Sequence, residues 1–81
     1  MVGIEVGLDY CRLFLGIKEL VRVMGETRGE DGIVKKVEDI LPYAGERITS
    51  VRFKKGAIGK ERRKVIRRIV REYNKSFVNS L

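Results

Sequence analysis

The apolar residues between positions 60 and 78 recur every three or four residues, and no glycine or proline interrupts them. At about 100° per residue this spacing places them on one side of an α-helix, in a stripe about 140° wide. The stripe contains Val65, Ile66, Ile69, Val70, Tyr73 and Phe77. Such a face must be buried against another part of the chain. We therefore expect a long amphipathic helix that docks on a second layer.

The N-terminal part of the chain alternates apolar residues with polar residues or glycine, which is typical of β-strands. A first run contains Val2, Ile4, Val6, Leu8 and Tyr10. A turn near residues 9–11 would lead into a second run, residues 12–17, with Leu13, Leu15 and Ile17 on one face. Lys18 and Glu19 then separate it from a third strand within residues 20–28, which contains Val21 and Val23.

Residues 29–32 read as a break, with Asp31 as the N-cap of a helix that contains Ile33, Val34, Val37, Ile40 and Leu41. Pro42 would end this helix, and Gly45 would form a turn. Residues 47–55 predict a fourth strand, with Ile48, Val51 and Phe53 facing inward. The order βββαβα predicts a single α+β two-layer domain over residues 1–81, with an antiparallel or mixed sheet and both helices on one face.

Composition excludes several kinds of chemistry. The chain has 81 residues, one cysteine and no histidine, so neither an internal disulfide nor a Cys–His or Ser–His–Asp nucleophile can form. We expect Cys11 to be a small core residue of a cytoplasmic protein with no signal peptide, membrane span or cofactor. The absence of Gln, His and Trp beside abundant Glu, Lys and Arg also resembles proteins adapted to high temperature.

The net charge of +7 is unevenly distributed along the chain. Residues 1–45 have six basic and eight acidic side chains, whereas residues 46–81 have twelve basic and only three acidic ones. Helical geometry places most of this charge opposite the apolar stripe, on Lys60, Arg63, Lys64, Arg67, Arg68, Arg71 and Lys75. Such a face can neutralise phosphates and release their counterions. It predicts RNA or DNA as the partner.

A glycine-bracketed turn precedes this helix and is flanked by Lys54, Lys55 and Lys60. Helix N-termini attract anions, so a phosphate could bind here. The segment Gly56-Ala57-Ile58-Gly59 is similar in spacing to the GxxG loop of the KH family of RNA-binding domains, which clamps the sugar-phosphate backbone. The helix between strand and loop and the final strand of that family have no counterpart in the predicted order.

Asp9 and the order of elements resemble nucleases of the ribonuclease H type, whose domains begin with three antiparallel strands, a helix, a strand and a helix. Such enzymes gather several carboxylates around metal ions. Here only Glu38 or Asp39 could join Asp9, and the fourth strand ends in basic residues where another acid is needed. We therefore expect Asp9 to be a turn residue, with no catalytic or metal site.

Two other interactions fit the same features. The basic face could dock an acidic protein, which makes a protein-interaction or assembly subunit the alternative function. An unpaired edge of the sheet could also support a homodimer. A basic amphipathic helix can lie on an anionic membrane, but here the sheet offers its apolar face a burial site. The leading hypothesis is a non-catalytic nucleic-acid-binding domain that mainly contacts the phosphate backbone.

Overall fold

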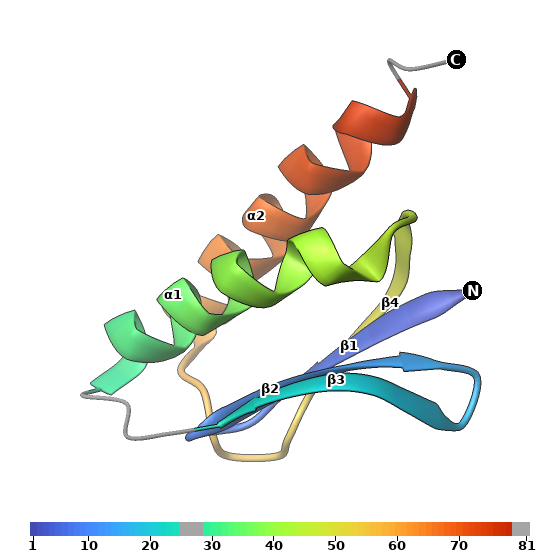
Figure 1. The fold of residues 1–81 in the computed structure, drawn as a ribbon. Coiled ribbons are helices and arrows are strands. Elements are labelled where there is room, and N and C mark those ends of the chain that lie inside the picture. The colour runs from blue at the N-terminus through green and yellow to red at the C-terminus, as the bar shows by residue number, and fades with distance from the viewer. Residues whose placement is uncertain (25–28, 79–81) are drawn as a thin grey trace.

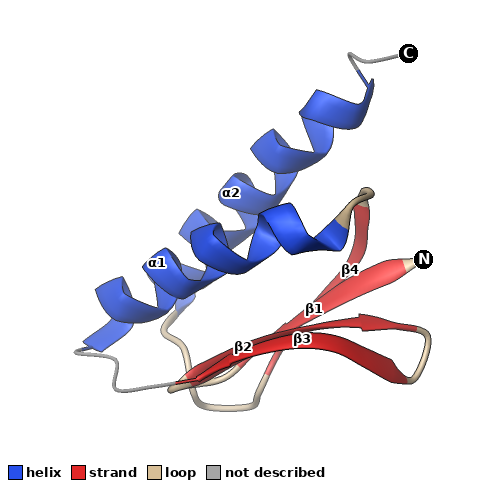
Figure 2. Ribbon diagram, in the orientation of Figure 1, coloured by secondary structure: helices blue, strands red, loops and turns tan. Residues whose placement is uncertain are grey.

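A computed structural model describes residues 1–24 and 29–78 of the chain. The predicted order βββαβα is confirmed, with one additional 3₁₀ turn after the first helix (Figure 2). The elements are β1 (Val2–Val6), β2 (Tyr10–Leu15), β3 (Lys18–Met24), α1 (Gly29–Ile40), η1 (Leu41–Ala44), β4 (Ile48–Phe53) and α2 (Lys60–Val78).

The four strands form one mixed sheet in the order β3-β2-β1-β4. β1, β2 and β3 pair as an antiparallel meander, whereas β4 runs parallel to β1. A parallel neighbour requires a crossover connection. Here β2, β3 and α1 lie between β1 and β4 in the chain. α1 crosses over the sheet and brings the chain from β3 back to the side of β1.

Both helices lie on the same face of the sheet, side by side, and neither helix covers the other face (Figure 1). α1 contacts β2 and β3, and α2 contacts β4 and α1. The core fills the space between the two layers and contains Cys11, as expected from the sequence. Its fully enclosed side chains include Ile4, Leu13, Ile33, Ile40 and Ile66.

An irregularity in β4 explains why its inward residues are not evenly spaced. Val2 lies opposite Ile48 but Gly3 lies opposite Ser50, so Thr49 is an extra residue in β4. A bulge of this kind shifts the alternation by one position. Ile48 and Val51, three residues apart, therefore both face the helices, and the inward orientation predicted for Ile48, Val51 and Phe53 is confirmed.

The predicted ends of the first strands were wrong. β1 stops at Val6 and the turn comprises residues 7–9, because the N–H of Gly7 donates to the carbonyl of Tyr10 (2.8 Å). Leu8 is consequently exposed, as are Leu15 at the end of β2 and Ile17 in the next turn. Lys18 and Glu19, predicted as separators, belong to β3. The periodicity was correct, but it continued past the real strand ends.

The start of the first helix also differs from the prediction. α1 begins at Gly29, so residues 29–32 are helical rather than a break, and Asp31 lies within the first turn instead of at the N-cap. The two glycines that suggested a loop are tolerated because the apolar face, with Ile33 and Val37, is buried in the core. Residues 25–28, which belong to the predicted third strand, lie outside the described residues.

Candidate nucleic-acid interface

α2 is held by its apolar stripe, as the sequence predicts. Ile66 and Val70 are buried, and Ile69 and Tyr73 pack against the same core from its margin. The carbonyl of Gly59 accepts the first helical hydrogen bond from the N–H of Arg63 (3.0 Å), so Gly59 occupies the N-cap position. The direction of the helix, and hence of its basic face, is set by these contacts.

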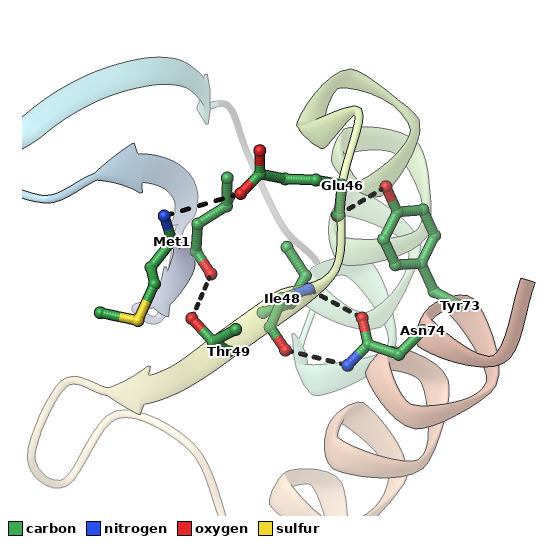
Figure 3. Close-up of polar contacts among 7 residues, drawn as sticks. Met1, Glu46, Ile48, Thr49, Tyr73 and Asn74 are labelled. Carbon is green, nitrogen blue, oxygen red and sulfur yellow. Dashed lines mark hydrogen bonds and ion pairs between the residues drawn. The ribbon is translucent and has the colours of Figure 1, made fainter. Parts of the chain in front are cut away.

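A polar clamp fixes the other end of α2 to the edge of the sheet (Figure 3). The side chain of Asn74 accepts a hydrogen bond from the N–H of Ile48 (2.8 Å) and donates one to the carbonyl of Ile48 (2.9 Å). The hydroxyl of Tyr73 donates to the carbonyl of Glu46 (3.3 Å). Asn74 thus acts as a substitute strand partner for the first residue of β4.

The cations predicted on the outer face of α2 are all exposed, namely Lys60, Arg63, Lys64, Arg67, Arg68, Arg71 and Lys75. Two of them form ion pairs within the helix. Lys64 lies 3.9 Å from Glu61, and Lys75 lies 3.1 Å from Glu72. Of the carboxylates in the described residues, none lies within ion-pair distance of Arg63, Arg68 or Arg71. These three guanidinium groups keep their charge available to solvent.

Arg67 differs from its neighbours. Its guanidinium carbon lies 5.1 Å from the centre of the Phe53 ring, a cation–π distance. Phe53 itself packs against the core, in agreement with the inward orientation predicted from the sequence. Arg67 therefore covers a core aromatic ring as well as carrying charge, and it does not simply project away from the apolar stripe.

Two hollows accompany the basic face. One of ≈ 450 Å³ lies along α2 and is lined by Glu61, Lys64, Val65, Arg67, Arg68 and Arg71. The second, of ≈ 370 Å³, is a groove between α2 and the outer edge of β4, lined by residues that include Thr49, Val51, Arg67 and Arg71. Arg67 and Arg71 line both hollows, so the basic face continues to the edge of the sheet.

The glycine-bracketed turn adds charge at the beginning of α2. Lys54, Lys55 and Lys60 are exposed there, together with Gly56 and Gly59. Gly56 has a φ of 76°, a left-handed conformation that side chains rarely adopt. Ile58 is buried in the core and anchors the turn. The structure thus brings every predicted site residue onto α2 or the turn that leads into it.

The carboxylates considered for a nuclease lie on separate elements. Asp9 is exposed in the turn between β1 and β2, whereas Glu38 and Asp39 are exposed on α1. Asp39 lies 3.8 Å from Lys35, in an ion pair along the helix. Among the side chains that the structure describes, which leave out those of residues 25–31 and 78–81, no three His, Cys, Asp or Glu residues are grouped so that they could hold a metal ion.

The uncovered face of the sheet has a group of residues that sequence analysis did not predict. Glu5 lies 2.7 Å from the Nε of Arg12, and it accepts a hydrogen bond from the hydroxyl of Tyr10 (3.1 Å). Burial raises the pKa of Glu5, but the hydrogen bonds from Arg12 and Tyr10 and the charge of Arg52 outweigh it, so its pKa is lowered. Glu5 is therefore held as a carboxylate among arginines.

Register is the signal that could have revealed this group. In the β1–β2 hairpin the pairs Gly3–Phe14 and Glu5–Arg12 lie directly opposite each other. Gly7 and Tyr10 are the next residues that face each other on this side of the hairpin, and a backbone hydrogen bond joins them. Once the turn is placed at residues 7–9, the sequence shows two glycines facing two aromatic residues, with an acid facing a base between them.

No family model matches the chain, and no curated protein or solved structure matches it. Among the helices that the structure describes, none is long and apolar enough to cross a membrane.

Proposed function

We propose that this protein is a non-catalytic nucleic-acid-binding domain whose α2 helix contacts the phosphate backbone of RNA or DNA. The observation that carries the proposal is the group of Arg63, Arg68 and Arg71, which are exposed on one side of α2 with no carboxylate of the described residues in ion-pair distance. Like charges three or four residues apart destabilise a helix by a few tenths of a kcal/mol per pair. Bound phosphates would relieve this repulsion, and the counterions released from the nucleic acid would add to the affinity.

The dimensions of α2 suit such a ligand. Lys60 and Lys75 are separated by about 22 Å at about 1.5 Å per residue. This length corresponds to about six base-pair steps along the axis of a duplex, at about 3.4 Å per step. Lys54, Lys55 and the backbone of residues 56–59 would contact a phosphate at the N-terminal end of the helix, where the helix dipole favours negative charge.

The test is charge reversal at two of these three arginines. Arg68→Glu combined with Arg71→Glu should abolish binding of labelled duplex DNA and RNA in fluorescence anisotropy, because it replaces two phosphate contacts with repulsion. Lys35→Glu combined with Lys36→Glu on α1 is the matched control, since it changes the net charge equally but elsewhere. Equal binding by wild type and the α2 variant would exclude the helix from the interface.

A competitor separates nucleic acid from an acidic protein partner. We expect unlabelled RNA or DNA to displace the labelled probe at much lower concentration than polyglutamate of equal charge. Displacement by polyglutamate at an equal or lower concentration would instead favour a basic face that docks an acidic protein.

A further inference from the structure

A row of charged residues crosses the uncovered face of the sheet. The strand registers place Arg22 opposite Arg12, Arg12 opposite Glu5, and Glu5 opposite Arg52, so the row contains one residue from each strand. Neighbouring residues Ile4, on β1, and Leu13, on β2, are buried beneath the helices. Side chains alternate along a strand, so the row lies on the opposite face, which no helix covers.

The three arginines of the row outnumber the two glutamates that pair with them. Glu5 pairs with Arg12, and Glu19, three residues before Arg22 in β3, pairs with Arg22 at 2.6 Å. No carboxylate in the described residues lies within ion-pair distance of Arg52. Arginines directly opposite each other, such as Arg12 and Arg22, also destabilise a sheet. An anionic ligand would neutralise the uncompensated charge at Arg52.

An aromatic ring lies on each side of the row, one against Gly3 of β1 and the other against Gly7, the first residue after β1. A Cβ atom at Gly3 would lie only 2.5 Å from the Phe14 ring, and one at Gly7 only 2.1 Å from the Tyr10 ring. The guanidinium carbons of Arg12 and Arg52 lie 6.0 and 5.2 Å from the centre of the Phe14 ring. That of Arg22 lies 5.7 Å from the centre of Tyr10. Aromatic and cationic groups thus alternate across the face.

The hollows beside Phe14 join this face to the basic face of α2. One of ≈ 270 Å³ is lined by Arg12, Phe14, Gly16, Ile17 and Arg52. Another of ≈ 230 Å³ is lined by residues that include Phe14, Arg52 and Thr49. Thr49 also lines the groove that contains Arg67 and Arg71. A chain lying along these hollows would pass around the edge of β4, from the sheet face to α2.

We infer that the uncovered sheet face is a base-stacking platform, and that the nucleic acid bound by this protein is single-stranded. Unpaired bases stack on the Phe14 ring, and Arg52 contacts the adjoining phosphate. The strand then follows the edge of β4 to α2. A duplex keeps its bases stacked inside and is stiff over this distance, so it can contact α2 but not both surfaces.

This inference rests on the proposed function, and the experiment separates the two. Anisotropy titrations would use short oligo(dT), oligo(U) and a duplex of equal length. Wild type should bind the single strands more tightly than the duplex. Phe14→Leu keeps an apolar side chain over Gly3 but removes the π face, and it should weaken oligo(dT) binding about tenfold. Its affinity for the duplex should be unchanged.

Two further variants keep the result interpretable. Phe14→Tyr retains the ring and should bind oligo(dT) like wild type, whereas Tyr43→Leu removes an exposed aromatic residue of η1 and should have no effect. Thermal melting of each variant reports whether it is folded. If Phe14→Leu is unstable, the test is whether Phe14→Tyr retains oligo(dT) binding and whether oligo(dT) protects the Arg52 guanidinium group from modification by phenylglyoxal.

Several outcomes would overturn the platform while leaving the proposed function intact. They are tighter binding of the duplex than of single strands, an unchanged oligo(dT) affinity of folded Phe14→Leu, or no protection at Arg52. An equal loss of oligo(dT) and polyglutamate binding in Phe14→Leu would also do so, since it would indicate an acidic polypeptide. Absence of any nucleic-acid binding by wild type would instead overturn the proposed function and the platform together.

Discussion

The side-chain amide of Asn74 forms hydrogen bonds with both backbone groups of Ile48, at 2.8 Å to the nitrogen and 2.9 Å to the oxygen. β4 is an edge strand, and edge strands expose backbone groups that can pair with other chains. Asn74 pairs with the N–H and the carbonyl of Ile48, the first residue of this edge strand, from within the same molecule. It also ties α2 to β4, near the groove that contains Arg67 and Arg71.

Asn74→Ala should therefore destabilise the fold by about 1–3 kcal/mol, because both backbone groups of Ile48 lose their partner in a partly buried place. Urea unfolding followed by circular dichroism measures the change. Asn74→Asp, which keeps an acceptor for the N–H but no donor, should also be destabilised. Ser76→Ala, two residues further along the exposed side of α2, is the control. An unchanged urea midpoint for Asn74→Ala would contradict the clamp.

Gly3 and Phe14 should show coupled effects on stability. A Cβ at Gly3 would overlap the Phe14 ring at 2.5 Å, so Gly3→Ala must displace the ring or the strand. We expect a loss of about 1–3 kcal/mol in the wild-type background. The loss should largely disappear in a Phe14→Ala background, where the space is free. A double-mutant cycle measures this coupling, and additive losses would contradict the packing of the ring on Gly3.

Cys11 should make stability fall at alkaline pH. Burial raises the pKa of its thiol from an ordinary value of 9.0 to about 11. Below pH 9 the thiol is protonated in both states, so stability is unaffected. Between about pH 9 and 11 only the unfolded chain ionises, and stability should fall by on the order of 2 kcal/mol.

The matched variant isolates this contribution. Cys11→Ala should lack the thiol component, although Tyr10 and Tyr73, whose pKa values burial also raises, continue to act in the same direction. Unfolding free energies of both proteins at pH 8, 9, 10 and 11 provide the measurement. Parallel pH profiles for wild type and variant would show that Cys11 ionises as readily in the folded state as in the unfolded chain.

Arg67 and Arg68 are adjacent but should respond differently to removal. Arg67→Ala uncovers the Phe53 ring and should cost about 0.5–1 kcal/mol of stability. Arg68→Ala should leave stability within about 0.5 kcal/mol of wild type, because its side chain is exposed. Thermal unfolding distinguishes the two. Equal effects on stability would remove the packing role assigned to Arg67.

The same two variants should weaken nucleic-acid binding in similar ways. Each removes one phosphate contact under the proposed function, so the slope of log K against log salt concentration should flatten by about 1 in each. Anisotropy titrations at several salt concentrations measure the slope. A slope identical to that of wild type in both variants would mean that neither arginine contacts a phosphate.

The apolar periodicity alone was sufficient for the order of elements. Apolar residues that recur at every second position share one face only in a strand, and those that recur about every 3.6 positions share one face only in a helix. This relation does not depend on the rest of the fold. For the same reason the stripe of α2, with Ile66 and Val70, and its basic opposite face with Arg68 and Arg71 were predicted correctly. Strand ends were not, because Leu8 and Ile17 extend the alternation into turns that backbone hydrogen bonding decides.

The remaining features depend on which strands become neighbours. The parallel pairing of β4 with β1, the bulge at Thr49 and the row from Arg22 to Arg52 arise from contacts between residues far apart in the chain. Local spacing contains no information on such registers, since any two alternating strands could pair. The two layers meet on one face only, and this packing leaves Phe14 and Arg52 on an uncovered sheet.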